Sequence, residues 1–348
     1  MTNGLLNYSF EELKNLITEM GEKSFRAGQI FRSLHLGLEF DEMTDLSKDF
    51  RARLCEKYSA QSVKILSSVK SVDGTEKFLF SLSDGNLIEG VLMKYKYGYT
   101  LCVSTQVGCR MRCAFCASGL EGLIRNLEPC EILGEIICVN KYLGGGLADK
   151  RKIINVVMMG SGEPLDNYDN VIKFLQLVSD KNGINISPRN ISLSTAGLVP
   201  QMYKLAQENF HVNLTVSLHS PIDEERQKIM PVAKAYSIKE ILDACQNYFD
   251  KTGRRYIFEY VLIKGQNDGE IHQKALIKLL KGRPCHLNII RLNEVKENNL
   301  KSTTDKDAYR FMGALEKEGI SATVRRRMGD DIEGACGQLR RRYIQDNK

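Results

Sequence analysis

The eight residues Cys109-Arg110-Met111-Arg112-Cys113-Ala114-Phe115-Cys116 decide how this chain is interpreted. They hold three of its ten cysteines, spaced Cys-x3-Cys-x2-Cys. Three thiolates this close together repel one another unless a cation lies between them, so the spacing predicts a metal centre. Zinc normally takes a fourth protein ligand, and no second Cys or Cys/His pair lies nearby in the sequence. An iron–sulfur cluster with one iron open to a substrate is the better fit, and a zinc site completed by a distant Cys or His is the alternative.

The other seven cysteines are scattered along a chain of 348 residues. An even total could form disulfides, but Met1 to Phe10 shows no basic stretch leading into an apolar one, so no secretory signal is predicted. We expect a cytoplasmic protein whose cysteines pack, bind metal or catalyse. No apolar run is long enough to span a membrane. The net charge of +6 permits an anionic partner without requiring one.

The phenylalanine before the third cysteine narrows the choice of metal. Cys-x3-Cys-x-Phe-Cys resembles the signature of the radical S-adenosylmethionine (SAM) superfamily. In that superfamily three cysteines hold a [4Fe–4S] cluster, and its open iron chelates the amino and carboxylate groups of SAM. The reduced cluster then cleaves SAM to a 5′-deoxyadenosyl radical. The resemblance implies that Cys109, Cys113 and Cys116 are the metal ligands.

From residue 99 onward, short β-branched runs alternate with amphipathic stretches. Such alternation predicts an α/β fold with a parallel sheet, either open or curled into a barrel. The expected strands are Thr100–Thr105, Ile153–Met159, Asn190–Thr195, Val212–Leu218, Tyr256–Ile263, His286–Arg291 and Ser321–Arg326. The expected helices between them are Glu128–Leu143, Asn167–Asp180, Val199–Glu208, Ser237–Lys251, Gly269–Lys281 and Thr304–Lys317.

Ligand sites in such folds form at the carboxyl ends of the strands, and the cysteine triplet falls at that edge. Three further segments follow strands in the same way: Gly160–Pro164, Ser194–Gly197 and Ser217–Ser220. Each alone could be turn chemistry, but their recurrence beside the triplet favours a binding site. Glu163, between a glycine and a proline, can reach an ammonium group, and SAM carries one.

Residues 1–98 follow a different pattern. Three helical stretches are expected from Ser9, Ser24 and Ser47, the first opened by the capping box Ser9-Phe10-Glu11-Glu12. Residues 67–98 read as β-hairpins that turn at Asp73-Gly74 and Asp84-Gly85. Basic runs gather at Lys94/Lys96, 150–152, 325–327 and 340–342, and this local concentration favours a phosphate backbone, with nucleic acid as the natural partner.

Over nearly its whole length the chain resembles the RlmN/Cfr family of radical SAM enzymes, which methylate adenine carbons in RNA. The resemblance is carried by segments spread along the sequence: 26–31, 101–109, Gly162-Glu163-Pro164-Leu165, Leu193-Ser194-Thr195, Ser217-Leu218-His219, Asn293, Gly329-Asp330-Asp331-Ile332 and Ala335-Cys336-Gly337-Gln338-Leu339. It implies a partial (β/α)6 radical SAM barrel. The domains expected are a helical RNA-binding domain at 1–65, a β-hairpin linker at 66–98, the barrel at 99–326, and a C-terminal loop and tail at 327–348.

The family's chemistry implies roles for two more cysteines. A first SAM methylates Cys336, and a second SAM, cleaved at the cluster, yields the radical that abstracts hydrogen from that methyl group. The methylene radical adds to the base, Cys102 attacks the Cys336 sulfur to release the product through a transient disulfide, and Glu89 accepts the proton of the base carbon. Family SAM contacts map to Gly162, Glu163, Ser194, Ser217, Leu218, His219 and Asn293. On residues alone, Cys102 would be a buried strand cysteine and Glu89 a surface carboxylate.

The resemblance is strongest to the RlmN branch, which implies methylation at C2 of adenine 2503 of 23S ribosomal RNA in the usual numbering, and of adenine 37 in transfer RNAs. Pro164 after Glu163 favours this branch. Cfr-type methylation at C8 of the same ribosomal adenine is the first alternative, because Leu218–Pro221 occurs in that branch too. A zinc-containing RNA-binding protein without activity is the second. The family also implies a flavodoxin- or ferredoxin-type electron donor, and we expect a monomer.

Two residues depart from the family pattern. Ser161 stands where methionine is usual, and Gly334 stands where alanine is usual before the Ala-Cys pair. Neither change removes a reactive group. The first could alter packing near SAM, and the second could loosen the loop that carries Cys336.

Overall fold

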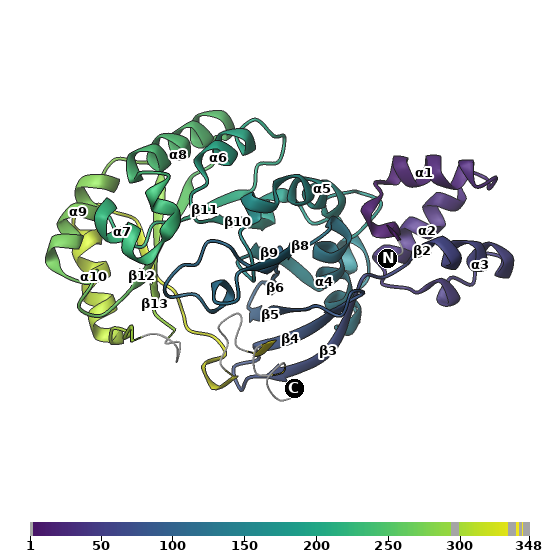
Figure 1. The fold of residues 1–348 in the computed structure, drawn as a ribbon, viewed down its shortest axis with the longest axis horizontal. Coiled ribbons are helices and arrows are strands. Elements are labelled where there is room, and N and C mark those ends of the chain that lie inside the picture. The colour runs from purple at the N-terminus through teal and green to yellow at the C-terminus, as the bar shows by residue number, and fades with distance from the viewer. Residues whose placement is uncertain (1–2, 294–298, 333–338, 341–342, 344–348) are drawn as a thin grey trace.

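The computed structural model describes residues 3–293, 299–332, 339–340 and 343. Its centre is a curved ten-stranded sheet in the order β14-β13-β12-β11-β10-β9-β6-β5-β4-β3 (Figure 1). The seven strands from β14 to β6 pair in parallel, and the last three pair antiparallel. The parallel strands are β6 (Gly98–Cys102), β9 (Ile153–Met158), β10 (Ile191–Thr195), β11 (Asn213–Ser217), β12 (Tyr256–Leu262), β13 (Cys285–Arg291) and β14 (Ala322–Val324).

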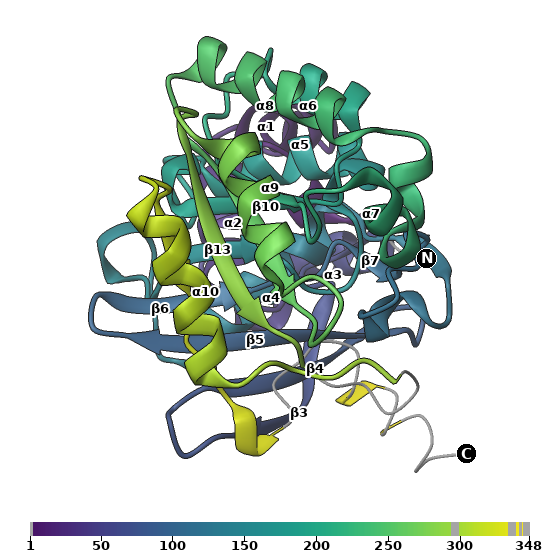
Figure 2. The ribbon, with the colours of Figure 1, turned by 90° about the vertical axis from the view of Figure 1, so that its left-hand side faces the viewer.

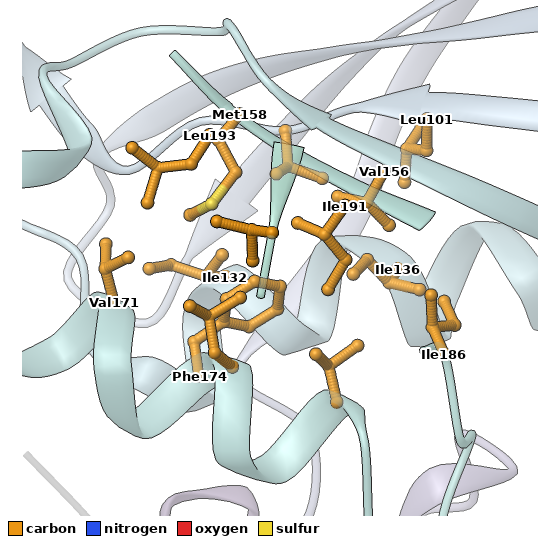
Figure 3. Close-up of a cluster of buried hydrophobic side chains, with 14 of the residues drawn as sticks. Leu101, Ile132, Ile136, Val156, Met158, Val171, Phe174, Ile186, Ile191 and Leu193 are labelled. Atoms are coloured by element: carbon orange, nitrogen blue, oxygen red, sulfur yellow. The ribbon is translucent and has the colours of Figure 1, made fainter. Parts of the chain in front are cut away.

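Helices connect the parallel strands and cover the outer face of the sheet. They are α4 (Pro129–Tyr142), α5 (Tyr168–Val178), α6 (Val199–Leu205), α7 (Asp223–Ile229), α8 (Ile238–Thr252), α9 (Glu270–Leu280) and α10 (Asp305–Lys317). The core forms where the apolar sides of these helices meet the strands. Ile132 and Ile136 of α4 and Phe174 of α5 pack against the strands that carry Val156 and Leu193 (Figure 3). The predicted alternation of strands and helices is confirmed.

The antiparallel strands are β3 (Val63–Lys70), β4 (Glu76–Leu82) and β5 (Leu87–Tyr95). Their turns lie at the predicted Asp-Gly pairs, where Gly74 and Gly85 have φ values of +86° and +82°. Strand β5 pairs directly with β6, so the hairpins extend the central sheet by three strands.

Three short helices form a separate layer at the N-terminus: α1 (Phe10–Glu19), α2 (Arg26–His35) and α3 (Lys48–Lys57). They lie at the outer side of α4 and α5, with the two-residue strands β1 (Asn3–Gly4) and β2 (Tyr58–Ser59) at their base (Figure 1). His35 anchors this layer, because its Nδ1 accepts a hydrogen bond from the backbone N–H of Ile184 at 3.1 Å. Burial lowers the pKa of His35 to about 3, so the ring is neutral and able to accept.

After β14 the chain crosses to the far edge of the sheet. The backbone N–H of Gly329 donates to Asp73 at 3.0 Å, and that of Val72 donates to Asp331 at 3.1 Å. The crossing segment therefore joins β14 at one edge to the β3–β4 turn at the other (Figure 2). No helix within the described ranges is long and apolar enough to cross a membrane.

Candidate active site

A cavity of about 380 Å³ lies at the carboxyl ends of the parallel strands and extends along strand β5 to Tyr95. Most of the residues singled out in the sequence line it. They are Cys102, Cys109, Cys113, Cys116, Gly162, Glu163, Ser194, Ser217, His219 and Asn293. Each comes from the end of a strand or from the loop that follows it, because parallel strands all finish at the same edge.

The cysteine triplet lies on the loop between β7 (Gln106–Gly108) and β8 (Leu123–Asn126). A side chain at Gly108, which has φ +77°, would lie 2.0 Å from the carbonyl oxygen of Gly122, so this close crossing needs glycine. The loop is tied to the barrel by the backbone N–H of Ala114, which donates to Ile229 at 2.9 Å. Burial and the neighbouring Cys116 thiol raise the pKa of Cys109 to about 12, and burial also raises that of Cys113.

Glu163 is a fully enclosed carboxylate held by the backbone. Its Oε2 accepts from the N–H of Ala196 at 2.6 Å and its Oε1 from that of Leu165 at 3.1 Å. Burial nevertheless raises its pKa to about 7. The preceding Gly162 has φ +112°, and a side chain there would lie 2.7 Å from Gln106. The chain therefore turns tightly here and presents Glu163 beside the triplet.

Two neighbouring residues at the end of β11 face different ways. His219 lines the cavity with a backbone φ of +58°, and its ring meets Phe115 edge-on at 4.7 Å. Its Nδ1 accepts from the N–H of Val261 at 3.1 Å, and burial lowers its pKa to about 3, so the ring is neutral. Leu218 is fully buried in the core and does not line the cavity. Any contact of Leu218 with SAM would therefore use its backbone.

Arg226 was missing from the residues predicted for the site. Its fully buried guanidinium donates to the carbonyl oxygens of Ala196, Ser217 and Leu218 at 2.7 to 3.1 Å, and so ties the ends of β10 and β11 together. Nη1 has no hydrogen-bond partner among the described residues. Burial lowers the pKa of Arg226 to about 10, which leaves it charged at neutral pH beside Cys113. In the sequence it lies in Asp-Glu-Glu-Arg-Gln-Lys, which reads as a solvated helix face.

Cys102 ends strand β6 and points into the barrel. It is 6% exposed and packs in a small cluster with Val91, Met93 and Met328. Met328 belongs to the segment that crosses from β14. This segment therefore lies against Cys102 inside the cavity.

Glu89 lies next to the large cavity, in a small one lined also by Ser118, Glu121, Ser161 and Arg340. It is 2% exposed, and its Oε2 is 3.0 Å from Nζ of Lys77, which is 1% exposed. The backbone N–H of Arg340 donates to Oε1 at 2.6 Å. The sequence indicated a surface carboxylate here and did not single out Lys77. The structure shows a buried ion pair between Lys77 and Glu89.

Ser161, the departure in the Glu163 loop, makes four local hydrogen bonds in the described part of the structure, and in two of them its carbonyl oxygen accepts from the N–H groups of Thr105 and Gln106 at 2.8 and 3.1 Å. Its N–H donates to Oγ of Ser104 at 3.0 Å, and its hydroxyl donates to the carbonyl oxygen of Gly108 at 3.4 Å. The serine therefore links the loop to the strand that leads into the triplet. Cys336 and Gly334 lie outside the described residues.

Known proteins match this chain over almost its whole length. Residues 103–275 match the radical SAM superfamily, and residues 3–59 match the ribosomal RNA large subunit methyltransferase N-terminal domain. A probable dual-specificity RNA methyltransferase RlmN of Clostridium novyi is 47% identical over 346 residues, 99% of each chain. The one of Clostridioides difficile is 51% identical over 341 residues, 97% of this chain and 98% of the relative. This chain belongs to the RlmN family.

The fold agrees with a solved member of the superfamily. A radical SAM methyltransferase from Sphaerobacter thermophilus superposes with a TM-score of 0.92 at 39% identity, covering 97% of this chain and 98% of that one. The partial radical SAM barrel with N-terminal helices is thereby confirmed. As a member of the RlmN family, the chain is a SAM-dependent radical SAM methyltransferase that acts on RNA.

Family membership implies SAM and a [4Fe–4S] cluster, and the cavity suits them. The three thiols line one cavity, yet no three Cys, His, Asp or Glu side chains in the described part of the chain are grouped tightly enough to hold a single ion. Thiolates on a cluster bind different irons and lie further apart than ligands of one ion. The unpartnered Nη1 of Arg226 supplies a buried donor beside Cys113, as an anionic group there requires.

Proposed function

We propose that this chain methylates C2 of an adenine in 23S ribosomal RNA, adenine 2503 in the usual numbering, and adenine 37 of transfer RNAs. The observation that carries the proposal is the single cavity shared by the cysteine triplet and Cys102, with the paired Glu89 beside it. The full-length likeness to relatives named as dual-specificity RNA methyltransferases supports the double substrate. Electrons would come from a flavodoxin- or ferredoxin-type donor, and the enzyme would act as a monomer in the cytoplasm.

The residues divide between cofactor and RNA. Cys109, Cys113 and Cys116 would hold the cluster, and Gly162, Glu163, Ser194, Ser217, Leu218, His219 and Asn293 would hold SAM. With these groups bound, the cluster and one SAM would supply the radical that removes a hydrogen atom, and a second SAM would supply the methyl group. The neutral His219 and the backbone-bound Glu163 would orient SAM without adding positive charge next to its sulfonium.

The remaining steps belong to three side chains. Cys336 would carry the methyl group and join it to the adenine carbon. Glu89 would accept the proton that leaves this carbon, because its side chain is held beside the cavity with Oε2 at 3.0 Å from Nζ of Lys77. The Cys102 thiolate would then attack the sulfur of Cys336, so that an S–S bond forms and the bond from that sulfur to the transferred carbon breaks. The carbon, bonded to the adenine, would keep the electron pair and take up a proton to become the methyl group of the released RNA. Reduction of that disulfide by an external thiol would restore the enzyme.

Nucleoside mass spectrometry of RNA from cells with and without the gene tests the methylated carbon. We expect 2-methyladenosine at the ribosomal and transfer RNA sites, lost on deletion and restored by the gene. An 8-methyl or dimethyl adenosine would overturn the C2 assignment in favour of C8 chemistry.

The role of Cys102 is tested by Cys102→Ala with anaerobically reconstituted enzyme. We expect a covalent enzyme–RNA adduct, visible as a band shifted on a denaturing gel and sensitive to nuclease. Cys245→Ala, at a fully buried core cysteine, is the control and should release free product. Free, normally methylated RNA from the Cys102 variant would refute the assignment.

A further inference from the structure

Two tyrosines stack at the turn between β5 and β6. The rings of Tyr95 and Tyr97 are parallel within 5°, with centroids 5.1 Å apart. Tyr95 is half-buried and lines the large cavity. Tyr97 is 62% exposed, so the ring face turned away from Tyr95 is open to solvent. Phe25, Tyr142 and Tyr309 are about as exposed, but the ring of Tyr97 is stacked on a ring that lines the cavity.

Basic residues from three distant parts of the chain lie on the segments that flank this stack or line the cavity with it. Lys94 and Lys96 alternate with the tyrosines and are exposed. Strand pairing of Tyr99 with Ile153 brings the exposed Lys152 to the same end of the sheet. Arg325 and Arg326 line the cavity with Tyr95, and their charges act on its hydroxyl. Among the described residues, no ion pair involves Lys94, Lys96, Lys152 or Arg326.

The stack lies at the opposite end of the cavity from the cysteine triplet. Tyr95 pairs with Gly98 at the start of β6, whereas Cys102 ends that strand and the triplet follows it. Asp73, the nearby acid of the β3–β4 turn, is engaged by the backbone N–H groups of Gly329 and Thr75. A polymer that inserts one unit toward Cys102 from this end would lay neighbouring units over the tyrosines and lysines.

We propose that Tyr97, backed by Tyr95, is a stacking platform for an unpaired nucleobase of the RNA substrate, with Lys94, Lys96, Lys152 and Arg326 holding the adjoining phosphates. An aromatic face interleaved with cations suits single-stranded RNA, because every base has a face to stack and every linkage carries a charge. The inference rests on the proposed function in taking the target adenine into this cavity. It does not depend on which adenine carbon is methylated.

Binding of a synthetic RNA hairpin with the target adenine in its unpaired loop tests the platform. In fluorescence anisotropy, Tyr97→Ala should weaken binding by roughly ten- to a hundredfold, the range for losing one base–aromatic stack. Tyr97→Phe keeps the ring and should stay within about twofold. Tyr203→Ala, at an exposed tyrosine on the outer helix α6, should match the unaltered enzyme. Iron content and circular dichroism check that each variant is folded.

The proposed phosphate contacts are tested by a separate measurement, the salt dependence of RNA binding. A Lys94→Ala/Lys96→Ala enzyme should bind with a log K against log salt slope smaller by about 1.4, the expected change for two contacts to a single strand. Photocrosslinking with 5-iodouridine placed beside the target adenine should map to Tyr95 or Tyr97 by mass spectrometry.

Three results would overturn the inference. One is unchanged RNA binding by Tyr97→Ala, including the case in which that variant instead loses a protein partner. The second is an equal loss in Tyr97→Phe, because the hydroxyl rather than the ring would then matter. The third is crosslinking confined to other segments. If the unaltered enzyme fails to bind or methylate the hairpin, the proposed function fails first, so the two failures are distinguishable.

Discussion

Two buried glutamates, one in each half of the sheet, are held in opposite ways. Glu89, on the antiparallel strand β5, lies against the buried Nζ of Lys77 at 3.0 Å. Glu163, after the parallel strand β9, forms no ion pair within the described chain and is held by backbone N–H groups. Burial raises the pKa of Glu163 to about 7. One carboxylate is therefore held by a buried cation, whereas the other is held by backbone N–H groups that only partly offset its burial.

The different surroundings of the two glutamates suggest that the two halves of the sheet have different tasks. In the proposed function, the parallel half, with the triplet and Glu163, would hold the cofactors. The antiparallel half, with Glu89 and Cys102 on its border, would act on the RNA. If this division is right, changes in the first half should stop all chemistry, and changes in the second should stop only the later steps.

The largest effect is expected from Cys113→Ala. Loss of one thiolate should abolish cluster binding, and with it both SAM cleavage and RNA methylation. Iron analysis and 5′-deoxyadenosine measured by chromatography after anaerobic purification provide the readout. Cys245→Ala is the matched control and should keep iron and activity. Bound zinc without iron in the unaltered protein would instead favour a structural metal site and would contradict the radical mechanism.

The variant Glu89→Gln should distinguish the early step at the cofactors from the later steps on the RNA. Without a proton acceptor, release of methylated RNA should slow by about 10²- to 10⁴-fold, while methylation of Cys336 by SAM continues. Peptide mass spectrometry measures the first methylation, and nucleoside analysis measures the RNA product. Equal loss of both would show that Glu89 supports the fold or the cofactors rather than a late step.

The variant Lys77→Met should show how much the buried ion pair of Lys77 and Glu89 contributes to the free energy of unfolding. Removing the cation leaves Glu89 in the interior without the countercharge of Lys77, so the free energy of unfolding should fall by about 3–5 kcal/mol. Urea denaturation measures this change. The double variant Lys77→Met/Glu89→Leu should recover most of the loss, because no lone charge remains. A double variant as unstable as the single one would contradict this explanation.

The smallest effect concerns the pH response of Glu163. In the folded protein this carboxyl keeps its proton up to about pH 7, against an ordinary pKa of 4.5 when unfolded. Between these values the folded state binds more protons, so stability should fall as pH rises, by about 1–3 kcal/mol between pH 5 and 8. Glu163→Gln should remove this slope in urea unfolding of iron-free protein. An unchanged slope would assign the pH dependence to other groups.

The fold was largely predictable because apolar runs and Gly turns are local signals. All seven parallel strands lie within three residues of their expected bounds, as Ile153–Met158 illustrates. Helix α7 and the short strands β7 and β8 were missed, since Asp223–Ile229 reads as a polar stretch and β7 has only three residues. Short elements of this kind are stabilised by tertiary contacts and leave little periodic pattern.

The residues of the site could be predicted from the sequence where they belong to a recognisable motif. The triplet, Glu163 and the strand-end serines could be found from spacing and position, whereas Glu89 and Cys102 needed the family resemblance. Lys77 and Arg226 were missed because a lone cation in a strand or in a charged helix indicates a solvent-facing residue. Their burial depends on β5 and on the ends of β10 and β11, which meet them only in the folded protein.

The hydrogen bond between Ser71 and Asp331 joins residues 260 positions apart. At a synthesis rate of about 5–20 residues per second, Ser71 leaves the ribosome roughly 13–50 s before its partner. Strand β3 is the last strand of the sheet, an open edge both during that interval and in the finished protein, and Leu66 and Val69 on it are exposed. The charged side chains of Lys64 and Lys70 on the same strand oppose the pairing of this edge with strands of other nascent chains.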